Sequence, residues 1–127
     1  HFNDKDIEIL DKIKKINDLI SDYESTLANP ILDYIYKRKD FNLIGRNKIE
    51  NKNRAPTISF TSKNITSEEL SNFLVKNKIA TRNDNFYAWR FLKALDIDPK
   101  DGVVRLSLTH YNSLDEVKLL IDVLEKI

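Results

Sequence analysis

The sequence predicts an α+β fold: about four mostly antiparallel strands with helices packed on one face of the sheet, preceded by a long N-terminal helix. Helically spaced apolar residues occupy the first part of the chain, and short β-branched runs alternate with capped amphipathic segments in the rest. A chain of 127 residues fits one domain that buries roughly two-thirds of its unfolded surface. We therefore expect a single domain in which residues 1–38 form a helical lead-in and residues 39–127 form the α/β core.

The lead-in has the three-and-four spacing of one apolar helix face. Its first part carries the apolar residues Ile7, Leu10, Ile13, Ile16, Leu19, Ile20, Tyr23 and Leu27. Pro30 lacks a backbone donor, so we expect a kink or a new helix start near Asn29. Apolar residues then continue the helical pattern to about Lys37.

The core contains four strand candidates and two capped helices. The strands are expected at residues 41–44, 57–61, 79–82 and 103–108, with turns at 83–85 and 98–102. Thr66 with Glu69 and Ser113 with Glu116 have the spacing of capping boxes, in which a hydroxyl and a carboxylate satisfy the free amides at a helix start. Each box therefore predicts an amphipathic helix, and the second helix closes the chain.

Residues 86–95 are apolar on nearly every side. We expect a helix there that is buried on more than one side, either because it is central to the domain or because a partner covers part of it. A purely structural interaction domain would also carry an apolar patch around Trp89 and Phe91.

The charge balance argues against a nucleic-acid-binding protein, because 21 basic and 20 acidic residues leave no clear basic excess. The stretch 37–54 is locally basic, with seven basic and two acidic residues. It lacks a series of aromatic residues between the bases that would stack on nucleotides, so a solvated loop is expected over residues 46–54. A phosphate-binding or nucleic-acid-binding patch is the alternative for this stretch.

The composition excludes several other kinds of site. The absence of cysteine rules out disulfides, thiolate metal sites and thiol nucleophiles in this chain. Two glycines cannot build a glycine-rich phosphate loop, and no metal-binding motif is found. No apolar run is long enough to cross a membrane, so no membrane partner is expected. The chain begins at His1 rather than at a methionine, and we expect it to be part of a longer protein.

Arg105 is the candidate binding residue that the strand pattern singles out. It lies inside the apolar run of residues 103–108, where a guanidinium must find a partner or reach an open edge. Its two parallel N–H groups suit it to a carboxylate. The alternative is an internal salt bridge or a solvent-exposed position on the outer face of the sheet.

Three blocks of sequence carry a resemblance to a known family. They are residues 54–61 (RAPTISFT), 79–88 (IATRNDNFYA) and 102–113 (GVVRLSLTHYNS), and an amphipathic helix follows the third block. Their order and spacing resemble the carboxy-terminal small domain of class V aminotransferase-like enzymes, which are pyridoxal-phosphate (PLP) enzymes of fold type I. The chain is most similar to the cysteine desulfurase and selenocysteine lyase branch, from about Tyr23 to Ile127.

The resemblance implies that Arg105 binds the α-carboxylate of an amino-acid substrate beside the cofactor. It also implies an active-site loop that contains Arg82, Asn85 and Tyr87. In this loop Asn85 occupies the position of a family histidine, and Tyr87 occupies that of the desulfurase cysteine. A persulfide needs a thiolate, so the loop lacks the nucleophile of desulfuration. The type of reaction stays open among transamination, elimination and desulfuration.

The resemblance also implies that PLP is held outside this chain. The Schiff-base lysine and the phosphate-binding groups belong to a large domain that is expected to precede His1, so the fragment alone is expected to bind no PLP and to be inactive. The intact protein is expected to be a cytoplasmic homodimer. A non-catalytic α+β module that binds a ligand or nucleic acid, or that has a regulatory role, is the alternative function.

Overall fold

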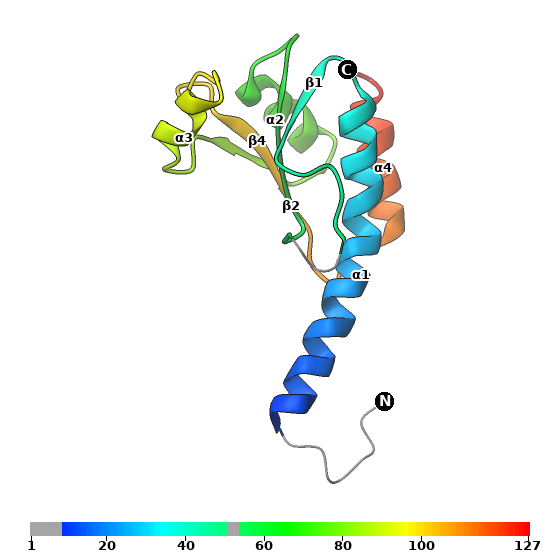
Figure 1. The fold of residues 1–127 in the computed structure, drawn as a ribbon. Helices are drawn as coiled ribbons and strands as arrows, with labels where there is room; N and C mark the ends of the chain where they lie inside the picture. The colour runs from blue at the N-terminus through cyan, green and yellow to red at the C-terminus, as the bar shows by residue number, and fades with distance from the viewer. Residues whose placement is uncertain (1–8, 51–53) are drawn as a thin grey trace.

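In the computed structural model, residues 9–50 and 54–127 are described. Over these residues the chain forms α1 (Ile9–Lys37), β1 (Phe41–Ile44), β2 (Thr57–Ser62), α2 (Ser67–Lys76), β3 (Arg82–Asp84), α3 (Trp89–Ala94), β4 (Val103–Ser107) and α4 (Leu114–Leu124). The strands form one sheet in the order β1-β2-β4-β3, and every neighbouring pair is antiparallel (Figure 1). The predicted α+β fold with a four-stranded antiparallel sheet and a long first helix is confirmed.

The two faces of the sheet differ in character because side chains alternate along each strand. One face carries the buried residues Ile58, Phe60, Val104 and Leu106. Helices α1, α2 and α4 pack against this face and complete the core (Figure 1). Ser59, Arg82 and Arg105 lie in register on the opposite face, which none of these three helices covers.

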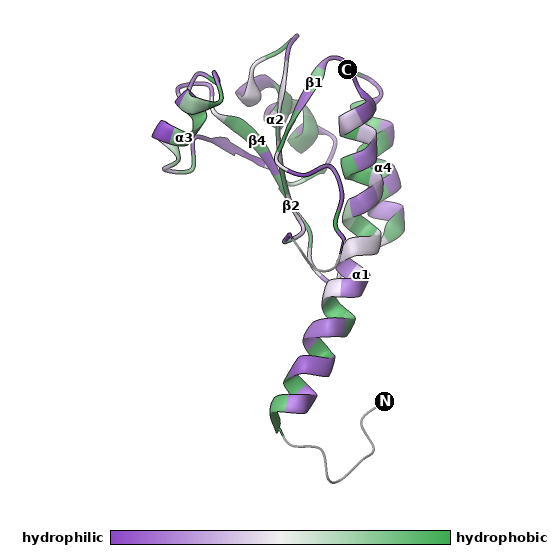
Figure 2. Ribbon diagram, viewed as in Figure 1, coloured by the Kyte–Doolittle hydropathy of each residue, from purple (hydrophilic) through white to green (hydrophobic). Residues whose placement is uncertain are grey.

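Helix α1 has two parts with different surroundings. Its C-terminal part contributes the buried residues Leu27, Ala28, Ile31, Leu32 and Ile35 to the core. Its N-terminal part extends away from the body, with apolar and polar residues alternating along it (Figure 2). Leu10 is 69% exposed and Leu19 is 56% exposed, so the predicted stripe has no cover there from the described residues. Ile7 lies outside the described residues.

The new helix start that was one expectation near Asn29 is wrong, because α1 is continuous from Ile9 to Lys37. A kink at this position stays a prediction. A proline inside a helix removes one backbone hydrogen bond and crowds the preceding turn. Here the buried residues Leu27 and Ala28 precede the proline, and Ile31 and Leu32 follow it in the same core cluster. Packing on both sides therefore holds the helix together across the missing bond.

The two capping boxes are present as predicted. Thr66 accepts a hydrogen bond from the backbone of Glu69, and the Glu69 carboxylate accepts the Thr66 amide at 2.9 Å. Ser113 and Glu116 repeat the arrangement at α4, with the Ser113 amide 2.7 Å from the carboxylate. These bonds lower the pKa of both glutamates, since each carboxylate accepts a backbone hydrogen bond in its charged form.

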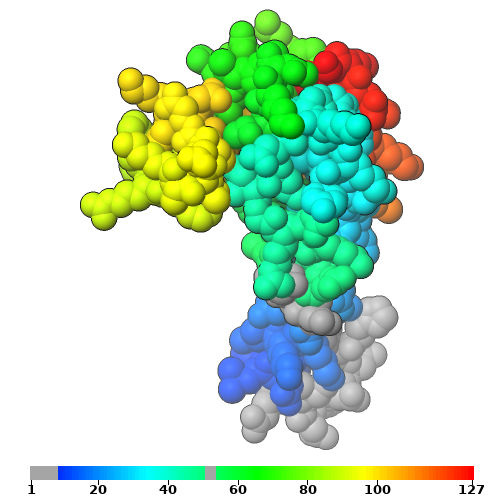
Figure 3. Space-filling view, turned by 45° about the horizontal axis from the view of Figure 1, so that its top comes forward, coloured from blue at the N-terminus to red at the C-terminus, as the bar shows by residue number. Residues whose placement is uncertain are grey.

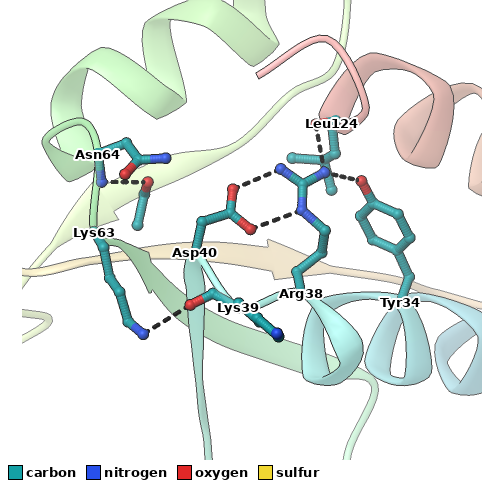
Figure 4. Close-up of polar contacts among 8 residues, drawn as sticks. Tyr34, Arg38, Lys39, Asp40, Lys63, Asn64 and Leu124 are labelled. Carbon is teal, nitrogen blue, oxygen red and sulfur yellow. Dashed lines mark hydrogen bonds and ion pairs between the residues drawn. The ribbon is translucent and has the colours of Figure 1, made fainter.

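The C-terminal end of α1 is joined to β1 and α4 by Arg38 (Figure 4). Its guanidinium donates to both carboxylate oxygens of Asp40, at 2.7 and 2.6 Å, and to the Tyr34 hydroxyl at 2.6 Å. It also donates to the carbonyl oxygen of Leu124 at 3.3 Å and lies 4.8 Å from the centre of the Phe41 ring. The hydrogen bonds from Arg38 lower the pKa of Asp40. This network fixes the helices relative to the edge of the sheet.

The segment between α2 and β4 differs from the prediction. The strand expected at 79–82 is instead β3, Arg82–Asp84, so the turn expected at 83–85 is also wrong. The reason is the end of α2: the amide of Ile79 still donates to the Leu74 carbonyl at 3.0 Å, after a left-handed residue at Lys78. Residue 79 therefore completes the helix terminus, and the extended backbone begins three residues later.

The helix expected at 86–95 is the shorter α3, and the alternative that it is central to this domain is wrong. Cover by a partner stays a prediction. Leu92 is its buried residue, whereas Phe91 is 56% exposed and Trp89 is 42% exposed. Phe86 and Tyr87 have left-handed backbone angles, with φ of 50° and 62°, and a helix cannot run through them. Helix α3 lies apart from the main core, at the left of Figure 1.

Candidate functional site

Arg105 lies at the centre of the sheet face that α1, α2 and α4 leave uncovered. It is partly buried on β4, between Ser59 of β2 and Arg82 of β3 in the sheet register. Like charges directly across two strands destabilise a sheet. Among the described residues no carboxylate forms an ion pair with either arginine. The predicted alternative of an internal salt bridge at Arg105 therefore finds no partner in the described part of the chain.

The aromatic ring of Phe86 covers one side of Arg105. The guanidinium carbon lies 3.9 Å from the centre of the ring, within the range of a cation–π interaction. Phe86 was not among the predicted site residues. An asparagine directly before an aromatic residue in a turn was the available signal, because asparagine side chains stabilise tight turns.

Asn85 holds the loop that carries Phe86. Its side-chain oxygen accepts the Tyr87 amide at 3.0 Å, and its backbone carbonyl accepts the Ala88 amide at 2.8 Å. Its side-chain amide donates to the carbonyl of Pro99 at 3.3 Å, which ties the loop to the segment before β4. These bonds stabilise the two left-handed residues that place the ring over the guanidinium.

Gly102 allows this loop to lie close to the start of β4. Its φ is +71°, and a Cβ atom at this position would lie 2.4 Å from the carbonyl carbon of Asp84. A side chain of any size is excluded there by the backbone of residues 84 and 85. The close approach brings the loop against the strand that carries Arg105.

Two cavities meet at Arg105. One, of about 190 Å³, is lined by Arg105, Arg82, Thr81, Ala80 and Ser107. The other, of about 180 Å³, has a mainly apolar lining that includes Phe86, Phe91, Leu92, Val103 and Ile44. Arg105 therefore lies between a hollow that it shares with Arg82 and an apolar one beneath the loop and α3.

The predicted site residues are brought together in part. Arg82 and Arg105 line the cavity of about 190 Å³, and Asn85 lines the apolar cavity together with Arg105. Tyr87 lines neither of these two cavities and is fully exposed. A larger hollow of about 330 Å³ adjoins the first cavity through Ala80 and Ser107, and one of about 460 Å³ lies elsewhere. Neither is lined by any of the four predicted residues.

The residues that line the two cavities at Arg105 do not fit PLP. Neither lining contains a lysine for a Schiff base or a glycine-rich phosphate loop. What they offer is a guanidinium with free donors, which suits the anionic end of a ligand. The described residues also contain no cluster of three potential metal ligands. The expectation that PLP is held outside this chain stays a prediction.

The family model of the class V aminotransferases (Aminotransferase class-V) matches residues 5–120. The chain belongs to the class V aminotransferase family. Members of this family and of the cysteine desulfurases are PLP enzymes, so the parent family of this class V domain is enzymatic. The resemblance predicted from residues 54–61, 79–88 and 102–113 is confirmed.

Relatives of this class V domain are longer proteins. An aminotransferase-like protein of Gibberella zeae is 28% identical over 115 residues, which are 90% of this chain and 29% of that protein. The cysteine desulfurase of Thermococcus onnurineus superposes with a TM-score of 0.73 at 25% identity, over 84% of this chain and 25% of that one. The cysteine desulfurase CsdA of Escherichia coli shares the fold, with a TM-score of 0.69 at 20% identity over 84% of this chain and 24% of that one. The chain thus spans about a quarter of the length of these proteins.

The basic stretch 37–54 is neutralised in part within its described residues. Lys37 pairs with Asp33 at 2.7 Å, and Lys48 pairs with Glu50 at 2.8 Å. Arg54 donates to the backbone carbonyls of Arg46 and Thr57. Residues 51–53 lie outside the described residues. No observation on the described residues favours the nucleic-acid-binding alternative.

No helix in the described residues is long and apolar enough to cross a membrane.

Proposed function

We propose that the chain is the small, substrate-binding domain of a PLP-dependent class V enzyme that acts on an amino acid, with Arg105 binding the α-carboxylate. The observation that supports this role is a partly buried guanidinium with an aromatic ring on one side and no carboxylate partner among the described residues. A charge in that position is stabilised when an anion binds to it. Membership of a PLP enzyme family supplies the amino-acid substrate class.

The chain's own contribution to the reaction is orientation. Arg105 would hold the carboxylate through two parallel hydrogen bonds, which fixes the position of the substrate's α-carbon. Arg82, Asn85 and Tyr87 would form the loop at the edge of the site. PLP supplies the electron sink in enzymes of this family. No thiolate is available from this chain, so we propose transamination or elimination without a persulfide on this loop.

The remaining parts of the proposal concern the intact protein. A PLP-binding large domain would complete the active site, and this domain of residues 1–127, with its lead-in at 1–38 and its core at 39–127, would be inactive alone. Exposed apolar residues on α3 and on the N-terminal part of α1 offer surfaces for that domain to cover. By analogy with the family, the intact protein would be a cytoplasmic homodimer.

The test is the substitution Arg105→Ala in the intact protein. We expect the KM for the amino acid to rise on the order of tenfold to a hundredfold, because charge-assisted hydrogen bonds to the substrate are lost. The absorbance of bound PLP should be unchanged, since this chain does not hold the cofactor. Lys76→Ala, which removes a cation from the exposed side of α2, is the matched control and should leave KM unaltered. An unchanged KM in the Arg105 variant would refute the proposed role.

A further inference from the structure

Arg82 and Arg105 form a cross-strand pair of like charge on the uncovered face of the sheet. They are directly opposite each other in the β3–β4 register, so their side chains leave the same face from adjacent strands. Such a pair is unfavourable unless an anion lies between or beside the two guanidinium groups. Both arginines line the cavity of about 190 Å³, together with Thr81 and Ser107.

The acidic groups nearest to this pair do not neutralise it. Asp84 lies two residues from Arg82 on the same strand and the same face. Its carboxylate accepts the backbone amide of Asn85 at 2.6 Å, and within the described ranges it forms no ion pair with either arginine. The lining of the cavity contains no acidic residue. The positive charge of the pair is therefore directed at the cavity.

The two arginines differ in how they are held. Arg105 is partly buried and has its guanidinium over the ring of Phe86. Arg82 is exposed on the edge strand, and its side chain forms no hydrogen bond or ion pair with any of the described residues. A fixed cation suits the group that every substrate shares, and an exposed cation beside it suits a second group that differs among substrates.

We propose that Arg82 binds a second acidic group of the ligand, so that the site takes an amino acid with an acidic side chain. This inference rests on the proposed function, in which Arg105 holds the α-carboxylate. Arg82 then determines specificity, because a substrate with a neutral side chain of the same shape leaves the charge of Arg82 without a partner. Ser107 lines the same cavity and offers a hydroxyl group to the ligand, whereas the Thr81 hydroxyl is hydrogen-bonded to that of Ser71 on α2 at 2.9 Å.

The experiment compares L-aspartate with L-asparagine, which have the same shape and differ by one charge. Each is titrated into the ¹⁵N-labelled chain at low ionic strength, and the Nε–Hε resonances of Arg82 and Arg105 are followed by NMR. We expect L-asparagine to shift Arg105 alone and L-aspartate to shift both arginines. L-aspartate should bind about two- to fivefold more tightly, as one exposed ion pair provides.

The variant Arg82→Gln should reduce the ratio of the two affinities to about one while leaving the affinity for L-asparagine unchanged. Arg90→Gln removes an equal charge from exposed α3 and should retain the preference. The backbone amide spectrum of each variant shows whether it is folded. A wild-type chain without preference, a preference that survives in Arg82→Gln, or a spectrum in which neither amino acid shifts the arginines would overturn the inference. A shift of Arg105 by both amino acids without preference overturns this inference alone and leaves the carboxylate role of Arg105 in place.

Discussion

The ring of Phe86 and a bound carboxylate can share the guanidinium of Arg105, because they use different parts of it. A stacked ring contacts the face of the guanidinium, whereas a carboxylate accepts hydrogen bonds in the guanidinium plane. The ring also removes water from one face, which strengthens the remaining interactions. The left-handed backbone at Phe86 and Tyr87 costs on the order of 1–3 kcal/mol per residue. The hydrogen bonds of Asn85 offset part of this cost.

Substitution of Gly102 can be compared with substitution of Gly45, the other glycine of the chain. Gly102→Ala adds a Cβ 2.4 Å from the backbone of Asp84, whereas Gly45→Ala, also at positive φ, meets nothing within 4 Å. We expect Gly45→Ala to lower the free energy of unfolding by about 1 kcal/mol, from the left-handed backbone alone. Gly102→Ala should lower it by about 3 kcal/mol and displace the loop that carries Phe86. Urea denaturation measures both, and equal losses would contradict the close approach described here.

Local signals explain which elements the sequence could predict. Thr66 with Glu69 and Ser113 with Glu116 define helix starts through hydrogen bonds within four residues, so α2 and α4 were predicted at their observed starts. The alternating strand β2 and the apolar strand β4 were predicted from the residue pattern within each strand, although the two strands pair across about 50 residues of sequence.

The elements that were mispredicted depend on backbone geometry that the residue pattern does not show. β3 begins at Arg82 because the amide of Ile79 still bonds to the end of α2. The loop at 85–88 depends on the close approach of Gly102 to the backbone of Asp84. The partial burial of Arg105 could be anticipated from its apolar strand, but its contact with Phe86 could not. That contact requires the register of β3 against β4, which no spacing in the sequence reports.

Helix α1 offers a test of where the core ends. Leu27 is fully buried in the core cluster, whereas Leu19 on the same helix is 56% exposed. Leu27→Ala should lower the free energy of unfolding of the chain by about 3 kcal/mol, because it deletes a buried side chain and leaves a cavity. Leu19→Ala should change it by less than about 0.5 kcal/mol. Denaturant titrations of both variants measure this difference. Equal decreases in the free energy of unfolding would show that Leu19 is buried as well, which would contradict its exposure in the structure.

At the scale of the whole molecule, two apolar surfaces lie at opposite ends of the core. Figure 3 shows the segment of α3 as a lobe at the left and the start of α1 at the bottom. The residues concerned are Leu10, Ile13, Ile16 and Leu19 on α1, and Trp89, Phe91 and Leu95 around α3. Contiguous exposed apolar residues mark surfaces that a partner covers. Because the chain spans about a quarter of its relatives' length, the rest of the intact protein is the partner we propose.

Hydrogen exchange measured by mass spectrometry can compare the isolated chain with the intact protein. In the isolated chain, peptides from residues 9–23 and 86–95 should exchange rapidly, because segments with few buried contacts open at low free-energy cost. In the intact protein their protection should rise by about tenfold or more, since a covered surface adds about 1.4 kcal/mol or more to each opening. Peptides from α2 serve as the control and should exchange at similar rates in both, because their buried face is already covered by the core of this chain. Equal exchange of residues 86–95 in the two proteins would contradict a domain interface at α3 and leave that surface to a separate partner.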